Sequence, residues 1–427
     1  RRMVDDAINI RGLKLYAIDH AGHVPVYREG EKPAPATGKK VAIVGGGPSG
    51  ISAAYYLGMM GHSVEIFEQR KRLGGMLRYG IPSYRLPREV LHEEIETLLT
   101  AGDIKVHKEV SIGGKDYPLS KLREEFDAVY IAIGAHTDKS LKIPGEDAEG
   151  VMSAVELLRR IGDDDYPDFR GKKVVVVGGG NVAMDCARSS LRLNADKVTL
   201  AYRRRKDDMT ALAEEVEATE VEGCEILELA APLKVEVEDG KAKALWVKQQ
   251  MISNIKGGRP APKDASAEPI RLEADIIVVA IGQGIDSYNF EQSGIAVKWG
   301  CIQAFDSEEV KGENMAGVFS GGDCVSGPAT VIRAIAAGKV AAANIDEYLG
   351  FHHPVTLPVE IPDPVPHNRP ACGRVKMRER PIDQRVHDFK LVEKGMTQEE
   401  MEQESGRCLR CDYYGFGKFR EGREVKW

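Results

Sequence analysis

The sequence has no uninterrupted apolar run that approaches the length of a membrane span, and no signal-peptide pattern near its start. A formal net charge of -7 and a pI near 5.9 mean that it lacks the basic excess of proteins that bind nucleic acid or anionic membranes. Cysteine is scarce: 7 in 427 residues, spread thinly, is typical of a reducing compartment and argues against a disulfide framework. We therefore expect a cytoplasmic protein whose partners are neither nucleic acid nor membrane.

The length and composition indicate a multidomain α/β protein. With 427 residues, the chain is too long for one hydrophobic core, so two or three domains are expected. Hydrophobic residues make up 42%, and glycine occurs 45 times, which fits a protein rich in turns. The chain begins with Arg1-Arg2 rather than with methionine, so we expect that residues upstream are missing or belong elsewhere.

The stretch VAIVGGGPSG, residues 41–50, organises the first part of the chain. Its four apolar residues predict a buried parallel strand, and the glycines then open a helix with no side chains between backbone and ligand. Gly45 permits a tight turn, Gly47 lets the backbone touch a pyrophosphate, and Gly50 lets the helix lie close on the strand. The helix N-terminus adds free N–H groups and a partial positive charge. The motif predicts a dinucleotide site.

The residues that follow support this interpretation. A helix is expected over residues 51–61, and SVEIFEQ then predicts a second strand that ends in Glu68. An acidic side chain about twenty residues after the glycines is where a ribose diol is hydrogen-bonded. The alternative is that Glu68 is a solvated strand end.

Two further segments of this unit are predicted to approach the ligand. The loop LGGMLRYGIPSYRLP, residues 73–87, is rigid and suits contact with a flat ligand, the alternative being an ordinary exposed connection. The strand AVYIAIGAH, residues 128–136, contains Gly134. Because glycine has no side chain, we expect the backbone to approach the ligand closely there as well. Between them a helix is predicted, and its inward residues are expected to be Val90, Ile95, Leu98 and Leu99.

A second copy of the glycine pattern occurs at residues 174–183, VVVVGGGNVA, with Gly178, Gly180 and Ala183 in the GxGxxA form. The strand that follows ends in Tyr202 and then Arg203-Arg204-Arg205 in place of an acidic residue. A carboxylate would repel a 2′-phosphate, whereas guanidinium groups pair with it, so this copy favours NADPH. The alternative is a solvated basic turn, and NADH use stays open.

The second copy is predicted to be a whole domain. Residues 223–271 alternate apolar and polar, with a hairpin at Asp239-Gly240, and predict an antiparallel appendage. ADIIVVAIGQGID, residues 274–286, then parallels the strand that closed the first unit. After it, a buried strand ends in Asp323 before a helix that has Ile332, Ala336 and Val340 on one face. A strand-end aspartate beside a helix N-terminus can bind a ribityl hydroxyl and a phosphate together.

The C-terminal region contains a CxxC pair, Cys408 and Cys411, in the stretch CLRCD. Two thiolates are half of the set that an iron–sulfur cluster or a structural zinc requires, and Cys372 could be a third. Three alternatives stay open for this pair: an iron–sulfur cluster, zinc, or no metal.

The chain resembles the two-dinucleotide-binding flavoprotein reductases through five motifs in order: VAIVGGGPSG, GGMLRYGIPSYRLPREV, VVVVGGGNVAMDCAR, AYRRR and SGGDCVSGPATVIRAIAAGKVAA. Within that group it is similar to the small (beta) subunit of NADPH-dependent glutamate synthase and its relatives, which include the FAD subunit of bifurcating NADH-dependent ferredoxin:NADP oxidoreductase. The resemblance implies an α/β fold of two Rossmann-like domains of the glutathione-reductase type, the second inserted into the first. The implied divisions are a connector (1–39), an FAD-binding domain (40–150 and 286–350), an NAD(P)H-binding domain (151–285) and a C-terminal extension (351–427).

The resemblance also implies the cofactor-binding residues. For FAD they are Gly45, Gly47, Pro48, Ser49, Gly50, Glu68, Gly75, Leu77, Arg88, Gly134, Asp323 and Thr330. For NADPH they are Gly178, Gly180, Asn181, Val182, Arg203, Arg204 and Gly282. Family members carry a cysteine-rich segment with two [4Fe-4S] clusters ahead of the flavin domain, and this chain begins with what normally follows that segment.

The implied activity is hydride transfer from NADPH, or NADH, to FAD and release of electrons to iron–sulfur centres, with no general acid or base. The expected partners are iron–sulfur or flavin-containing redox subunits of a larger complex that bifurcates electrons or feeds ferredoxin, with glutamate synthesis as the alternative. A disulfide reductase of the thioredoxin reductase kind would need a CxxC inside a nucleotide domain, whereas the CxxC here lies in the far tail. An alternative of another class is an electron-bridging or scaffold subunit without productive nucleotide turnover.

Overall fold

The computed structural model describes residues 5–22, 25–27, 32–114, 117–256, 259–304, 308–354 and 372–409. They divide into two compact units. The larger unit comprises the described parts of Val26–Val355 together with Ile382–Leu391, and the smaller unit those of Arg1–Pro25, Thr356–Pro381 and Val392–Trp427.

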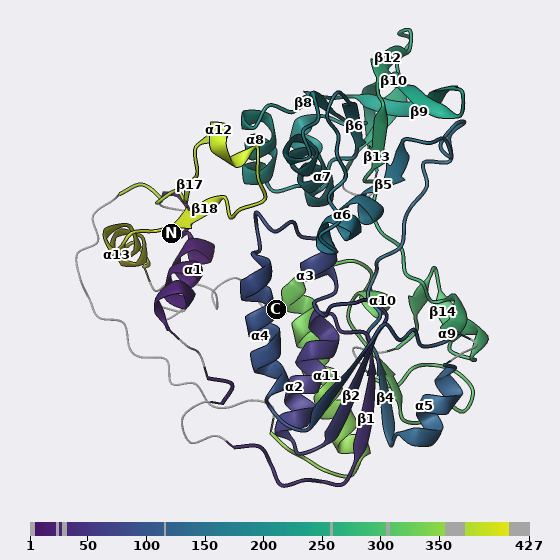
Figure 1. Cartoon of the computed structure of the whole chain (residues 1–427), viewed down its shortest axis with the longest axis vertical. Helices are drawn as coiled ribbons and strands as arrows, with labels where there is room; N and C mark the ends of the chain where they lie inside the picture. Colours follow the sequence, from purple (N-terminus) through teal and green to yellow (C-terminus); the bar gives the residue numbers. More distant parts are fainter. Residues whose placement is uncertain are drawn as a thin grey trace. The chain divides into compact units, whose positions relative to one another are not determined.

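The first domain of the larger unit is built on a five-stranded parallel sheet in the order β16-β4-β1-β2-β3. The strands are β1 (Lys40–Val44), β2 (Ser63–Glu68), β3 (Ile104–Lys108), β4 (Ala128–Ile131) and β16 (Val318–Ser320). The helices are α2 (Pro48–Met59), α3 (Met76–Tyr79), α4 (Arg88–Leu99), α5 (Leu119–Glu125), α10 (Asp323–Ser326) and α11 (Val331–Tyr348). Figure 1 shows α2, α4 and α11 along one side of this sheet and α5 on the other.

Both faces of this sheet are buried, because successive residues of β1 pack into two different hydrophobic clusters. Ile43 packs with Leu57 of α2 and Ile345 of α11, whereas Val44 packs with Leu122 of α5 and with Phe290. Continuous apolar strands covered on both faces are typical of parallel sheets. The strand predicted from VAIV therefore forms the centre of the domain.

The second domain repeats this plan with a parallel sheet in the order β5-β13-β6-β7-β8. The strands are β5 (Val151–Ser153), β6 (Lys173–Val177), β7 (Lys197–Ala201), β8 (Glu225–Leu227) and β13 (Ile276–Val279). The helices are α6 (Ala154–Gly162), α7 (Asn181–Arg192), the 3-10 turn η1 (Lys206–Asp208) and α8 (Ala213–Val221). Strand β13 pairs with β6 as β4 pairs with β1, so the predicted repeat of a whole domain is confirmed.

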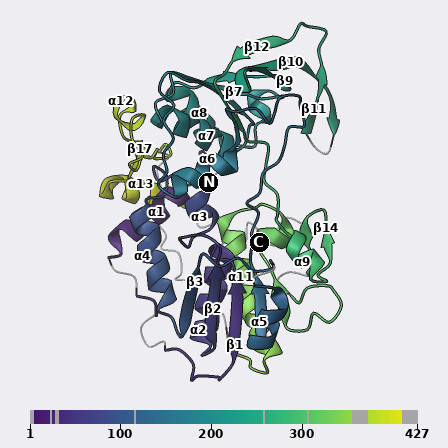
Figure 2. The same ribbon diagram turned by 45° about the vertical axis from the view of Figure 1, so that its right-hand side comes forward.

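An antiparallel sheet is appended to the second domain. Its strands are β9 (Ala230–Glu238), β10 (Lys241–Lys256), β11 (Arg259–Asp264) and β12 (Ile270–Glu273), and Figure 2 shows them side by side. The predicted hairpin turn lies between β9 and β10, where Asp239 and Gly240 have φ of 50° and 77°. Helix α9 (Tyr288–Gln292) and the short strands β14 (Val297–Lys298) and β15 (Cys301–Ile302) follow.

The smaller unit contains α1 (Ile10–His20), β17 (Arg378–Glu379), β18 (Glu393–Gly395) and α13 (Gln398–Gly406). The buried carboxylate of Glu404 ties its segments together. It accepts hydrogen bonds from the backbone N–H groups of Asn9 and Val375 and from Nη1 of Arg407, each 2.7 Å long. Segments near the start and the end of the described chain are thus hydrogen-bonded to the same buried carboxylate, that of Glu404. Helix α12 (Ile382–Arg385) belongs to the larger unit.

The predicted inward face of α4 differs from the structure. Val90 is 48% exposed, and the buried stripe of α4 is formed by Leu91 and Ile95. These two residues are four apart and share one face of the helix, while Val90 lies more than a quarter of a turn away from that stripe. In α11 the face that carries Ile332 and Val340 is exposed, and small residues on the other face, led by Gly338, let α11 lie directly on α2.

A buried acid in the second domain predicts acid sensitivity. The carboxylate of Glu222 accepts hydrogen bonds of 2.7 to 3.1 Å from the guanidinium groups of Arg188 and Arg192 on α7. Burial by itself would raise its pKa, but the hydrogen bonds from Arg192 and Arg188 lower the pKa of Glu222 from 4.5 to about 2. A lowered pKa stabilises the folded state above pH 4.5, and this stabilisation is lost as the pH falls toward 2.

We therefore expect the free energy of unfolding to fall by about 1.5 kcal/mol between pH 4.5 and pH 3, and this loss to be absent in Glu222→Gln. Urea unfolding at several pH values measures it. Glu217→Gln, on the exposed side of α8, is the matched control for removing one carboxylate. An acid loss of equal size in wild type and Glu222→Gln would contradict this assignment.

Candidate functional site

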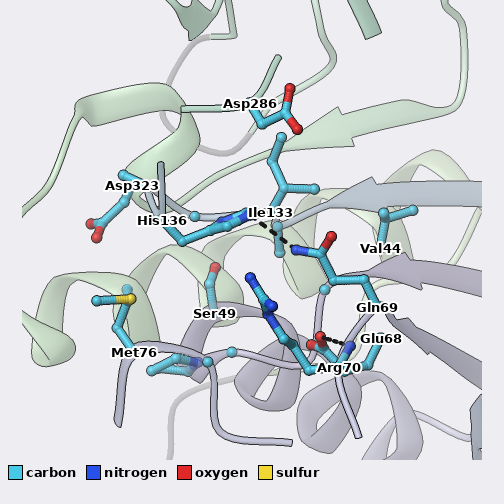
Figure 3. A pocket seen from close by; sticks show the side chains of 18 of the residues that line it. Val44, Ser49, Glu68, Gln69, Arg70, Met76, Ile133, His136, Asp286 and Asp323 are labelled. Carbon is cyan, nitrogen blue, oxygen red and sulfur yellow. Dashed lines mark hydrogen bonds between the residues drawn. The ribbon is translucent and has the colours of Figure 1, made fainter. Parts of the chain in front are cut away.

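A pocket opens where the strands of the first sheet end. Its lining includes Val44 at the end of β1, Glu68 at the end of β2, Ala132 after β4 and Gly321 after β16. In open α/β sheets, ligands bind at the carboxyl ends of the strands. Figure 3 shows the side chains of Ser49, Glu68, Met76, His136 and Asp323 around this pocket.

The glycine turn between β1 and α2 forms one wall of the pocket. Gly45 has φ of 109°, and a Cβ there would lie 2.5 Å from the carbonyl oxygen of Ala132. A Cβ on Gly50 would lie 2.0 Å from the carbonyl oxygen of Gly45. Both glycines are thus required by the packing of the protein itself. A Cβ on Gly47 would meet only the Cα of Gly75 at 3.7 Å, so this position is open on the pocket side.

Glu68 stands beside the glycine turn with its carboxylate fixed by the backbone. Oε2 accepts a hydrogen bond from the N–H of Gly46 at 2.8 Å, and Oε1 accepts one from the N–H of Arg70 at 2.7 Å. Burial raises the pKa of this carboxyl. Each oxygen keeps a second lone pair, so the residue can still accept hydrogen bonds from two hydroxyl groups in the pocket.

Asp323 and Thr330 form the opposite wall, where α10 and α11 begin. Oδ1 of Asp323 accepts a hydrogen bond from the N–H of Ala329 at 3.2 Å, and burial raises the pKa of this aspartate. Thr330 is the N-cap of the 18-residue helix α11 and makes no side-chain cap hydrogen bond. The helix therefore presents its positive end to the pocket.

The structure gathers most of the flavin-site residues named above around this one pocket. Those that line it are Gly45, Gly47, Pro48, Ser49, Glu68, Gly75, Gly134, Asp323 and Thr330. Gly50, Leu77 and Arg88 lie outside the lining: Gly50 packs α2 on β1, and Leu77 packs against the hydrophobic core. Arg88 donates from Nη1 to the carbonyl of Leu77 at 3.3 Å.

The pocket also contains polar side chains that the sequence patterns did not single out. The amide of Gln69 contacts Nε2 of His136 at 2.9 Å, as Figure 3 shows, and Nδ1 of His136 lies 3.0 Å from the carbonyl of Ile133. Burial and the neighbouring Arg70 lower the pKa of His136, so a neutral ring that donates from Nδ1 and accepts at Nε2 satisfies both contacts. Asp286, after the inserted domain, lies on the same pocket. Gln69 follows the predicted acidic residue directly, and His136 ends the predicted strand, so only their position hinted at a role.

The glycine turn of the second domain has the same construction. Gly178 has φ of 154°, and a Cβ there would lie 2.3 Å from the carbonyl oxygen of Ala280. Gly180 is the N-cap of α7, where a Cβ would meet only Oγ1 of Thr210 at 3.5 Å. The side chain of Asn181 accepts a hydrogen bond from the N–H of Leu212 at 2.9 Å, and Val182 packs on the core of the domain. Gly282, with φ of 119°, follows β13.

The three consecutive arginines after β7 have different surroundings. Nε of Arg204 donates to the carbonyl of Pro260 in β11 at 2.7 Å, and Arg205 pairs with Asp208, with 3.0 Å between Nε and Oδ2. Arg203 is exposed, and within the described ranges it makes neither a hydrogen bond nor an ion pair. Its guanidinium is therefore the one that can meet a nucleotide phosphate without giving up another contact.

The predicted metal pair is only partly visible. Cys408 and Cys372 are half-buried free thiols, and Cys411 lies outside the described residues. Among the described residues, the side chains of His62, Asp346 and His353 form a cluster of potential metal ligands. Oδ1 of Asp346 lies 2.9 Å from Nε2 of His62 and 2.8 Å from Nδ1 of His353, which are hydrogen-bond distances. The ligand atoms of a tetrahedral zinc lie about 2.0 Å from the ion and therefore about 3.3 Å from one another. The distances between these three side chains are shorter than that, so we interpret the contacts as hydrogen bonds.

The comparisons with known proteins agree with this architecture. Residues 39–338 match the model of the family described as pyridine nucleotide-disulphide oxidoreductase. The chain is 38% identical to the NADP(+)-dependent formate dehydrogenase subunit beta of Moorella thermoacetica, over 96% of this chain and 62% of that protein. It is 33% identical to the NADPH-Fe(3+) oxidoreductase subunit beta of Geobacter sulfurreducens, over 96% of this chain and 67% of that one.

Two further matches cover a smaller part of this chain. The glutamate synthase [NADPH] small chain of Escherichia coli is 33% identical over 80% of this chain and 75% of its own. Mycobacterium tuberculosis FprA in complex with NADPH shares the fold, with a TM-score of 0.62 at 20% identity, over 74% of this chain and 85% of that one. None of the helices in the described part of the chain is long and apolar enough to cross a membrane.

Proposed function

The chain belongs to the pyridine nucleotide-disulphide oxidoreductase family and is an FAD-dependent NAD(P)H oxidoreductase, and from this we propose that it is the subunit of a redox complex that accepts hydride from NADPH. The observation that carries the proposal is the pair of glycine turns, each with an open position, Gly47 and Gly180, at the start of a 12-residue helix. Two dinucleotides thus have a place in one unit of the chain.

The first-domain pocket fits FAD. Gly47 leaves room for the pyrophosphate beside the N-terminus of α2, and the fixed carboxylate of Glu68 can accept from both hydroxyls of a ribose. Asp323 and the N-terminus of α11 lie where a ribityl hydroxyl and a phosphate would bind, and Gly75 and Gly134 bring backbone to the same ligand. The donors and acceptors are those that a flavin dinucleotide needs.

FAD would supply the chemistry of the reaction, since a bound flavin can accept one hydride, which carries two electrons, and release these electrons singly. The contribution of this chain is to bind and orient. Glu68 and Asp323, which line the pocket, would hold the cofactor at the carboxyl ends of the strands. In the second domain, Gly180 would leave room for the pyrophosphate of NADPH, and the exposed guanidinium of Arg203 would pair with its 2′-phosphate. No proton transfer by a side chain is required.

The same fold also serves disulfide reductases, so the position of the cysteines matters. Cys186, Cys224 and Cys324 are buried free thiols, and no cysteine of the described residues lines the pocket. A disulfide reductase needs a cysteine pair at the flavin. This absence at the pocket wall favours an electron acceptor other than a disulfide.

The acceptor that we propose is an iron–sulfur or flavin centre of a partner subunit in the cytoplasm. Two relatives that match 96% of this chain are named as beta subunits, one of an NADP(+)-dependent formate dehydrogenase and one of an NADPH-Fe(3+) oxidoreductase. The chain spans about 62% of the length of the first of these. Electron bifurcation, reduction of ferredoxin and a cluster at Cys408 and Cys411 belong to this proposal, with glutamate synthesis as the alternative acceptor reaction.

Anaerobic titration of the FAD-loaded protein with NADPH tests the proposal. We expect the absorbance of the flavin near 450 nm to bleach within seconds, because hydride transfer between aligned cofactors needs no further component. NADH at the same concentration should bleach it more slowly. A protein that holds FAD but is bleached by neither nucleotide would instead be the electron-bridging subunit considered above.

A further inference from the structure

The two nucleotide domains meet at a buried ionic junction. Arg85, in the loop after α3 of the first domain, donates from Nη1 to both carboxylate oxygens of Asp185 on α7, each at 2.9 Å. Its Nη2 lies 2.8 Å from Oε1 of Glu215 on α8. The ring of Tyr84, which is fully buried, lies under the guanidinium group of Arg192 at 4.0 Å. The contact between the domains is therefore specific in orientation, because two carboxylates on different helices hold the two terminal nitrogens of one planar guanidinium group.

A short piece of the C-terminal extension completes this junction. Residues Ile382–Leu391, here named the strap, cluster with the larger unit although the sequence on either side of them belongs to the smaller one. Arg385 is 3% exposed, and its Nε lies 2.9 Å from Oε1 of Glu222, the same carboxylate that Arg188 and Arg192 hold. Arg385, from a distant part of the chain, thus adds a third guanidinium group to the carboxylate of Glu222 at the end of α8.

The strap also touches the first domain. The carbonyl of Phe389 accepts a hydrogen bond from the hydroxyl of Ser83 at 3.2 Å. The ring of Phe389 lies 6.1 Å from that of Tyr84 and 4.9 Å from that of Tyr166, between the centroids. Tyr84 belongs to the first domain and Tyr166 to the second, so one aromatic ring of the strap packs against both. The strap is bonded to each domain by different residues.

We propose that the strap, residues Ile382–Leu391, is a positioning element for hydride transfer, which holds the second domain at the orientation that brings the two nucleotide sites together. This inference rests on the proposed function. Hydride transfer requires the reacting atoms to lie about 3 to 3.5 Å apart, and a displacement of about 1 Å can slow such a step 100-fold. Residues that set the angle between the domains therefore control the rate without touching either cofactor.

The variants Phe389→Ala and Arg385→Gln, alone and together, test the proposal in the full chain loaded with FAD. We expect the rate constant of flavin bleaching at saturating NADPH to fall about 10-fold in each single variant and about 100-fold in the double variant. Flavin content and the dissociation constant for NADP⁺ should stay within about 2-fold of wild type, since no strap residue lines the pocket or the second glycine turn. Arg385→Lys, which keeps the charge but loses the planar fork, should recover part of the rate.

Gln384→Ala is the matched control, because Gln384 is exposed on the same helix as the buried Arg385. A wild-type rate constant in Phe389→Ala and in the double variant would overturn the proposal, and so would a loss of NADP⁺ affinity with an unchanged rate constant. If Arg385→Gln fails to fold, Phe389→Ala decides alone, because Phe389 is only half-buried. Failure of wild-type protein to bleach with NADPH would overturn the proposed function instead, which is a different result from a slow variant.

Discussion

Replacing Gly47 with leucine should yield a folded protein that retains no FAD. A Cβ at this position has 3.7 Å to its nearest neighbour, and the backbone φ of -84° is one that any residue adopts. The side chain therefore costs the protein little, yet it fills the space beside the N-terminus of α2 that a pyrophosphate needs. The ratio of flavin to protein absorbance after purification measures the loss, and it should drop to the background level.

The matched control is Gly50→Val in the same turn. A Cβ there would lie 2.0 Å from the backbone oxygen of Gly45, so α2 would have to move off β1, at a cost of about 3 kcal/mol or more. We expect Gly50→Val to lower the unfolding temperature or to yield insoluble protein, while Gly47→Leu keeps a normal circular dichroism spectrum. A yellow, fully loaded Gly47→Leu variant would exclude the first pocket as the flavin site.

Replacing Arg203 with glutamine should remove the preference for NADPH over NADH. Hydrogen bonds to a charged group contribute about 1.5 to 3 kcal/mol, so the KM for NADPH should rise about 10- to 100-fold while the KM for NADH changes little. Arg203 is exposed, and solvent ions screen such a pair. The NADPH preference of wild type should therefore also narrow as the salt concentration is raised, and that of Arg203→Gln should not.

Arg205→Gln is the control for this variant, because Arg205 is already paired with Asp208. It removes the same charge from the same turn and should leave the KM ratio near that of wild type. Equal effects of the two substitutions would mean that the basic turn attracts the nucleotide only by its total charge. A changed kcat with an unchanged KM would place Arg203 outside the phosphate site.

The sequence predicts much of the fold because the backbone conformations that require glycine are set by a few neighbouring residues. Gly45 and Gly178 must adopt positive φ against a neighbouring strand, so each copy of the motif marks a strand, a turn and a helix at once. The run of apolar residues before each turn forms a strand that is covered on both faces. The order of the two sheets then follows from the repeat, since the strands 128–131 and 276–279 take the same place in each.

Contacts between distant segments were not accessible in the same way. Val90 is a different case, because the i, i+4 spacing of Leu91 and Ile95 already marks the buried stripe of α4 in the sequence. The sequence does not distinguish the three arginines after β7. In the structure, one of them bonds to β11 and another pairs with Asp208, whereas Arg203 makes neither contact. The pairing of Gln69 with His136 likewise joins residues from two strands. Such pairs depend on tertiary structure, which cannot be predicted from the local pattern of a single sequence.

Part of the pocket in the first domain is formed by residues that follow the second domain in the sequence. Strand β16 joins the sheet beside β4, with Val318 opposite Val129, and Asp323 follows it, although the whole second domain is translated between the two strands. The second sheet draws its strands from one continuous stretch, Val151 to Val279, so the nascent chain can finish that domain while the first still lacks its fifth strand. A chain that ended before residue 323 would therefore contain every strand of the second sheet but would lack Asp323 and Thr330, which line the pocket of the first domain.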